Sequence, residues 1–183
     1  MRRAYKFRLY PNRNQERELE IMLETHRRLY NACLGQRKSV YEKDKISVSY
    51  CEQSAWFKNQ RAVHPWFAKL NFSSAQATMR RLDKAYAAFF RRLEAGEKPG
   101  YPRFKVAGRY DSMEFPAYGD GIRLQEKLRI QHVGQVSNSI EGWKARSKPS
   151  RSSGKPINGM PSSPATWAMC RWRPAPTRRL GST

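Results

Sequence analysis

Aromatic and cationic side chains alternate in one short segment, and this is where the sequence predicts its clearest chemistry. Residues 98–105 read KPGYPRFK, a segment that combines two rings with three cations: Tyr101, Phe104, Lys98, Arg103 and Lys105. The prolines and the glycine exclude a helix and favour a rigid, extended turn. Exposed rings can stack on bases or riboses while neighbouring cations pair with phosphates. The segment therefore predicts contact with a polynucleotide; the alternative, of equal weight, is that both rings anchor the core.

The element that positions this segment is an amphipathic helix directly before it. Apolar residues recur there at steps of three and four, at Ala75, Met79, Leu82, Tyr86, Phe89 and Leu93, so one face is expected to be buried. Ser73 is the expected N-cap, with Gln76 completing a capping box and Phe72 as a hydrophobic staple. Gly96 is expected to supply the left-handed residue that ends the helix.

The opposite side of this helix is cationic. It carries Arg80, Arg81, Lys84, Arg91 and Arg92, against the single acid Asp83. A solvated face is the common explanation for such a pattern. In a chain of net charge +21, the imbalance favours a phosphate backbone as the partner.

The whole composition supports a polyanionic partner. A net charge of +21 over 183 residues exceeds what solubility requires and indicates nucleic acid. No run approaches the roughly 20 apolar residues of a spanning helix, and no signal peptide is recognisable. We therefore expect no membrane partner, no small-molecule substrate and a cytoplasmic location. The length allows one domain or one and a half.

Metal and disulfide chemistry are not indicated. The three cysteines, Cys33, Cys51 and Cys170, are scattered and form no C-x-x-C pair, so neither a disulfide framework nor a zinc ribbon is expected. His26 and the other histidines are equally isolated. We expect His26 and Cys33 to pack inside a helix, and we predict no catalytic residue, no metal ligand and no cofactor.

The N-terminal part of the chain predicts a strand followed by a helix. Alternation in residues 1–10 indicates a half-buried strand that Pro11 ends. Asn12 and Gln15 can form a capping box for a helix running to about Tyr41. Its buried stripe is expected at Leu19, Met22, His26, Leu29 or Tyr30, and Cys33. Four cations here are candidate contacts to nucleic acid, or simply exposed charges: Lys6, Arg8, Arg27 and Arg28.

The remaining elements complete an α+β fold. Ser49 and Glu52 form a second capping box, for a helix to about Arg61. Short alternating segments around Met113, Ile122 and Leu128 predict strands. A lone first strand needs partners, and these later strands are the ones available. We therefore expect a sheet built from both ends of residues 1–136, with helices inserted between them.

Several phrases resemble one known family. RAYKFRLYP, RRLYNACL, the run from Trp66 to Lys105 ending in GYPRFK, and SMEFPAYGDGIRL are similar to the N-terminal half of TnpB/OrfB proteins, the transposases of insertion sequences. The resemblance covers residues 1–135 and implies an RNA-guided DNA endonuclease family, with DNA and a guide-type RNA as partners. It implies that residues 1–10 and 111–136 are strands of a partial wedge-type barrel. Residues 11–110 would be a recognition-lobe-like helical region whose N-terminal part is described as a helix-turn-helix.

The family's chemistry is not carried over to this chain. That resemblance places catalysis in a RuvC-like domain with three acidic metal ligands and an inserted zinc ribbon. No residue of this sequence matches a RuvC acidic motif. The resemblance therefore predicts a truncated member that binds nucleic acid without cutting it. The alternatives are a free-standing helix-turn-helix-like DNA- or RNA-binding regulator and a non-functional pseudogene product.

The composition changes abruptly in residues 137–183. This tail holds six of the 11 prolines, nine serines and a single acid, which predicts a disordered basic segment. It also holds three tryptophans, which such segments seldom contain. A one-base frameshift explains both features, because codons forced by Trp and Met re-read as Glu, Ala, Gly and Val, and permitted codons elsewhere restore a family-like sheet sequence. An evolved basic tail is the rival interpretation.

Overall fold

The computed structural model describes residues 8–124 and 127–139, and the backbone of 169–171. The N-terminal strand β1 (Arg8–Tyr10) is followed by four helices: α1 (Arg13–Asp44), α2 (Tyr50–Val63), α3 (Pro65–Ala68) and α4 (Phe72–Glu94). Five strands follow, namely β2 (Ser112–Glu114), β3 (Ile122–Leu124), β4 (Leu128–Ile130), β5 (Gly134–Ser139) and β6 (Met169–Arg171). The fold is therefore mixed helix and sheet, as predicted.

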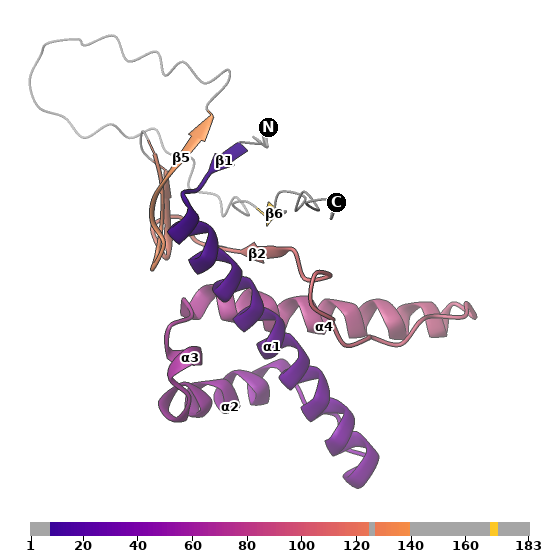
Figure 1. Cartoon of the computed structure of the whole chain (residues 1–183). Coiled ribbons are helices and arrows are strands. Elements are labelled where there is room, and N and C mark those ends of the chain that lie inside the picture. Colours follow the sequence, from indigo (N-terminus) through magenta and orange to yellow (C-terminus); the bar gives the residue numbers. More distant parts are fainter. Residues whose placement is uncertain (1–7, 125–126, 140–168, 172–183) are drawn as a thin grey trace, which may run out of the picture.

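The sheet is assembled from both ends of the chain. Four antiparallel strands lie in the order β1-β5-β4-β3, with Leu9 opposite Asn138 and Arg129 opposite both Arg123 and Gln135. A second, two-stranded sheet pairs β2 with β6. The four-stranded sheet is open, with β1 and β3 at its edges. In Figure 1 it lies at the N-terminal end of α1, apart from the far end of α4.

Two predicted helix starts are confirmed. Asn12 and Gln15 form a reciprocal capping box at α1, and Ser49 and Glu52 form one at α2. The end of α4 is also confirmed, because Gly96 has φ +73° and the N–H groups of Gly96 and Glu97 donate to the carbonyls of Leu93 and Arg92. These two bonds form a Schellman motif.

The predicted start of α4 is wrong by two residues. Asn71, and not Ser73, is the N-cap, and its side chain accepts from the Ser74 N–H at 3.0 Å. The Ser73 hydroxyl instead donates to the side chains of Asn71 and Asp120, and Phe72 lies inside the helix. The Ser73 hydroxyl, which the capping-box pattern predicts to cap the helix, therefore bonds to Asp120, 47 residues away in sequence.

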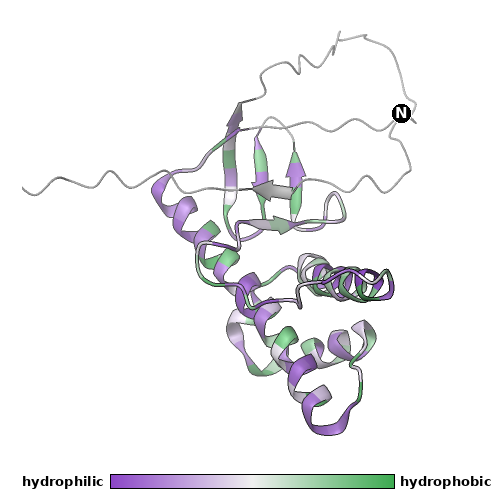
Figure 2. Cartoon of the chain, turned by 90° about the vertical axis from the view of Figure 1, so that its right-hand side faces the viewer, coloured by the Kyte–Doolittle hydropathy of each residue, from purple (hydrophilic) through white to green (hydrophobic). Residues whose placement is uncertain are grey.

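One hydrophobic core joins helices and strands. The predicted stripe of α1 is buried, with Met22 packed at its margin. The core includes Leu29, Leu34, Phe57, Met79, Leu82, Met113, Phe115, Ile130 and Val136. In Figure 2 α1 is mostly hydrophilic, with its hydrophobic residues in patches. None of the described helices is long and apolar enough to cross a membrane.

Only the first half of the apolar stripe of α4 belongs to this core. Ala75, Met79 and Leu82 are fully buried, whereas Leu93 is 55% exposed. Figure 1 shows why: the C-terminal half of α4 extends past α1 and is accompanied only by the segment that follows it. The prediction of a continuous buried face is therefore wrong for the last turns.

Strand β5 crosses the predicted boundary at residue 137. Strand β5 continues to Ser139, because Ser137, Asn138 and Ser139 pair with β1. The backbone of Met169–Arg171 pairs with β2. The rest of the predicted disordered tail lies outside the described residues, as does the start of the predicted first strand.

Candidate nucleic-acid interface

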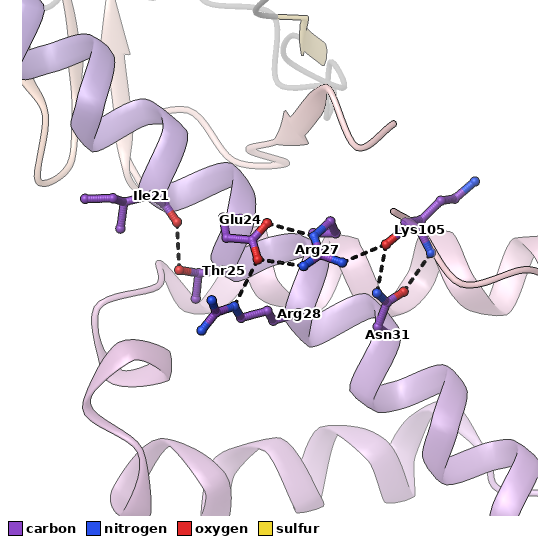
Figure 3. A network of polar contacts seen from close by, with 7 residues as sticks. All are labelled: Ile21, Glu24, Thr25, Arg27, Arg28, Asn31 and Lys105. Atoms are coloured by element: carbon purple, nitrogen blue, oxygen red, sulfur yellow. Dashed lines mark hydrogen bonds and ion pairs between the residues drawn. The ribbon is translucent and has the colours of Figure 1, made fainter. Parts of the chain in front are cut away.

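The segment after α4 folds back onto α1 and is fixed there by its backbone. The Asn31 amide accepts from the Lys105 N–H at 2.8 Å and donates to the Lys105 carbonyl at 2.9 Å. The Arg27 guanidinium donates to the same carbonyl at 2.8 Å. Figure 3 shows these three bonds meeting at the backbone of one residue, Lys105. We call Arg27, Asn31 and the Lys105 backbone the clamp.

Glu24 orients the arginine of the clamp. Its carboxylate accepts from Arg27 at 2.6 and 2.7 Å and from Arg28 at 3.0 Å (Figure 3). The hydrogen bonds from Arg27, and then those from Arg28, lower the pKa of Glu24 to about 2. The carboxylate therefore stays ionised, and it holds Arg27 in place for the Lys105 carbonyl.

The clamp places two exposed rings beside a lysine of α1. Tyr101 and Phe104 are 42% and 52% exposed, and the ammonium of Lys38 lies 5.9 and 5.8 Å from their ring centroids. The edge of Phe104 lies over Gly35, 3.9 Å from where a Cβ would stand. We call Lys38, Tyr101 and Phe104 the platform. It combines stacking surface with positive charge, as a single-strand-binding site does.

Tyr101 also connects the platform to α4. Its hydroxyl lies 2.8 Å from the hydroxyl of Tyr86, and its ring packs edge-on against Tyr86 and Phe89. Burial and this hydrogen bond raise the pKa of Tyr86. Tyr101 therefore packs against α4 on one side and is exposed on the other. It combines the two predicted roles, a core anchor and a ring available for stacking.

Five predicted cations of α4 and of the segment after it are exposed. They are Lys84, Arg91, Arg92, Lys98 and Arg103. Arg92 makes only a loose ion pair with Glu97, at 3.8 Å. Arg80 is exposed too, and its guanidinium lies 5.5 Å from the Tyr50 ring. Because Arg80, Lys84 and Arg91 recur at helical spacing, they share one face of α4.

Two arginines predicted to contact nucleic acid bond mainly within the fold instead. Arg81 donates to the Ser112 carbonyl at 3.1 Å and lies 5.3 Å from the Tyr110 ring. Its Nη2 is buried and has no partner among the described residues. Arg27 is held by Glu24 and the clamp. Both side chains position other elements.

The remaining predicted residues lie elsewhere. Arg28 is 62% exposed on α1 and bonded to Glu24. Arg8 is exposed on β1, with its guanidinium 5.5 Å from the Tyr10 ring, at the sheet end of the molecule. The Lys105 ammonium lies 5.9 Å from the Tyr30 ring. Lys6 is outside the described residues.

Sequence reasoning missed three residues that build this region: Asn31, Arg37 and Lys38. Arg37 is buried and bonds to Gln53 at 2.9 Å and to Asp83 at 3.0 Å, which joins α1, α2 and α4. A signal for it existed, because Arg37 continues the buried stripe four residues after Cys33. Asn31 is a poor helix former in mid-helix, which also indicates a specific hydrogen bond.

Comparison with known proteins supports the resemblance that the sequence indicates. Residues 1–45 match the family model of a helix-turn-helix domain of OrfB/IS605 proteins. An Escherichia coli K12 protein named "Putative RNA-guided DNA endonuclease InsQ" is 29% identical over 131 residues, which are 69% of this chain and 30% of that protein. The resemblance to TnpB/OrfB proteins is confirmed. A Streptomyces pristinaespiralis protein named "Putative RNA-guided DNA endonuclease" is also 29% identical, over 57% of this chain and 25% of its own.

The chain matches only part of each relative. The chain spans less than a third of the length of either TnpB/OrfB relative. The segment matched to the helix-turn-helix model, residues 1–45, contains β1 and the uninterrupted helix α1. The turn that joins α1 to α2 spans residues 45–49. Among the described residues, no three His, Cys, Asp or Glu side chains form a group that could hold a metal ion.

Proposed function

We propose that this chain is the nucleic-acid-binding N-terminal region of a TnpB/OrfB-type transposase and that it binds polynucleotide at the platform. The observation that carries the proposal is the position of Lys38 within 6 Å of two exposed rings. Stacking on such rings is sequence-tolerant, and the exposed Lys98 and Arg103 of the same segment would pair with the phosphates. Guide-type RNA and DNA are the proposed partners, by analogy with the names of the relatives.

The proposed structural roles follow from the resemblance to TnpB/OrfB proteins. In this proposal the helices act as a recognition lobe and the strands as part of a wedge-type barrel. The chain contributes binding and positioning, and no residue described in the structure is assigned to strand cleavage.

Truncating Phe104 tests the platform. Phe104→Ala removes a half-exposed ring that the clamp does not use, so we expect a stable protein whose binding to a labelled single-stranded oligouridylate weakens by about 1–3 kcal/mol. Fluorescence anisotropy measures the affinity. Tyr41→Ala is the matched control, because Tyr41 is 57% exposed at the far end of α1 and has a lysine over its ring. Equal affinities for the two variants would contradict the platform.

A second candidate function is a DNA-binding regulator, which the match of residues 1–45 to a helix-turn-helix model favours. It predicts tighter binding to duplex DNA than to single strands and no effect of Phe104→Ala. The same anisotropy experiment with a duplex probe separates the two candidates.

We also infer that the residues after about Val136 are translated out of the family's frame. Support comes from the positions forced by Trp and Met codons, all of which re-read as family-like residues. The nucleotide sequence is the test: a one-base shift should open a longer TnpB-like frame, and an early stop there would contradict the inference. Both this inference and the rival interpretation, an evolved basic tail, must account for the pairing of β6 with β2.

A further inference from the structure

The solvent-facing side of the four-stranded sheet carries cations in register. Paired residues on neighbouring strands point to the same face, and successive residues alternate. Ile122, Leu128, Ile130 and Val136 are buried, so the positions between them face outward. We call this set the outer sheet face: Arg8, Tyr10, Arg123, Arg129, Gln135 and Ser137, placed by the registers of β1, β3, β4 and β5.

Two arginines on this face stand directly opposite one another. Arg123 of β3 pairs with Arg129 of β4, and both side chains are exposed. Like charges at directly opposite positions destabilise a sheet. No carboxylate among the described residues forms an ion pair with either arginine. An anion bound between them would remove this repulsion.

The two arginines line an open hollow of about 230 Å³, together with Gly119, Gly121, Ile122 and Gln131. The Arg123 Nε–H points to the Gly119 carbonyl at 3.4 Å, and the Gln131 N–H donates to the Gly121 carbonyl at 2.8 Å. Gly121 has φ +82°, and a Cβ there would lie 2.9 Å from Asn71 and Phe115. The wall of the hollow is therefore fixed against the start of α4.

The carboxylate in the same turn is already engaged. Asp120 accepts from the Asn71 amide at 2.7 Å and from the Ser73 hydroxyl. These hydrogen bonds, Ser73 first, lower the pKa of Asp120. Asn71 also donates to the Gln131 side chain at 3.1 Å. The Asp120 carboxylate thus bonds to residues at the start of α4. It forms no ion pair with Arg123 or Arg129, so both guanidinium groups can bind an external anion.

We propose that the outer sheet face binds single-stranded polynucleotide, with one phosphate between Arg123 and Arg129 and a base on Tyr10. Guanidinium groups offer the forked donors that match phosphate oxygens. Tyr10 is 52% exposed, with Arg8 beside its ring. It lies three strands from Arg123 and two residues further along the sheet, which is roughly 16 Å at the usual strand spacing and rise per residue. The proposal rests on the proposed function and adds a second contact surface, remote from the platform.

The test compares two double variants of the full chain that lose the same charge. Arg123→Gln with Arg129→Gln should weaken binding of labelled oligouridylate roughly tenfold and lower the slope of log K against log salt by about 0.7, the value for one phosphate on a single strand. Lys58→Gln with Lys69→Gln removes two exposed cations of the α2–α3 region and should leave the slope unchanged. Arg123→Lys with Arg129→Lys should give an intermediate affinity.

A measurement without nucleic acid separates binding from folding. Relief of the Arg–Arg repulsion should raise the melting temperature of the Arg123→Gln, Arg129→Gln variant, whereas a structural role would lower it. The inference is overturned if the two glutamine doubles show the same slope and affinity. If wild type binds and Phe104→Ala weakens binding while the arginine double does not, only this inference fails. If wild type binds no polynucleotide, the proposed function fails with it.

Discussion

His26 shows how a single buried residue connects the fold to pH. Its Nδ1 lies 2.9 Å from the Thr78 hydroxyl and its Nε2 lies 3.3 Å from the Ser74 hydroxyl, so it joins α1 to α4. Burial, with a smaller effect of the Arg81 charge, lowers the pKa of His26 to about 4. The neutral ring is therefore the form that the folded protein favours, as the predicted core position implies.

This lowered pKa predicts a loss of stability in mild acid. The unfolded chain binds a proton at His26 near pH 6.5, whereas the folded chain does so only near pH 4, so the free energy of unfolding falls as the pH falls through that window. Between pH 7 and pH 5 the loss should be about 2 kcal/mol. Urea unfolding at several pH values measures it, with His26→Gln as the control. Parallel pH curves for both proteins would contradict the assignment.

Residue types alone do not tell which cations face solvent. Arg80 and Arg81 are neighbours on one helix, yet the first is exposed and the second binds Ser112 of β2. That difference depends on strand β2, which sequence periodicity does not place against α4. Burial of His26 and Cys33 was predictable because both lie on the periodic stripe of α1.

A substitution of Asn31 tests whether the clamp holds the segment after α4 against α1. Its amide makes two hydrogen bonds to the backbone of one residue, Lys105, in the segment after α4. Asn31→Ala should therefore free this segment, raise the amide exchange rate of Lys105 and weaken oligouridylate binding, at about 1 kcal/mol for each lost bond. Asn31→Asp keeps an acceptor for the Lys105 N–H and should give a smaller effect. Unchanged exchange at Lys105 in Asn31→Ala would show that the clamp does not hold the segment.

Elements with local signals were predictable, and those set by distant contacts were not. The capping boxes at Asn12 and Ser49 and the left-handed Gly96 depend on residues within four positions, and all three are confirmed. The N-cap at Asn71 depends on Asp120, and the platform depends on Asn31 meeting Lys105 across 74 residues. Neither pairing leaves a periodic pattern in the sequence.

At the scale of the whole molecule, excess positive charge opposes folding while it favours binding. A net charge of +21 implies self-repulsion that salt screens, because the Debye length falls to about 10 Å at 0.1 M. We expect the melting temperature to rise between low and moderate sodium chloride while affinity for oligouridylate falls. Circular dichroism melts and anisotropy measure the two trends. Trends of the same sign would contradict this account of the charge.

The single core predicts one cooperative transition in those melts. It joins helices to strands from both ends of the described chain, so loss of either part should unfold the other. A non-cooperative melt would favour an unfolded pseudogene product. The sheet itself was predictable from the need of the first strand for partners; its open, four-stranded order came from the structure.

Photocrosslinking shows directly whether a polynucleotide lies on the platform. The full chain would be irradiated with bound oligouridylate, and the crosslinked residues identified by mass spectrometry. The platform predicts crosslinks at Tyr101 and Phe104, which Phe104→Ala reduces. Crosslinks confined to other exposed rings, such as Tyr41 and Trp66, or no crosslink at saturating oligouridylate, would contradict it.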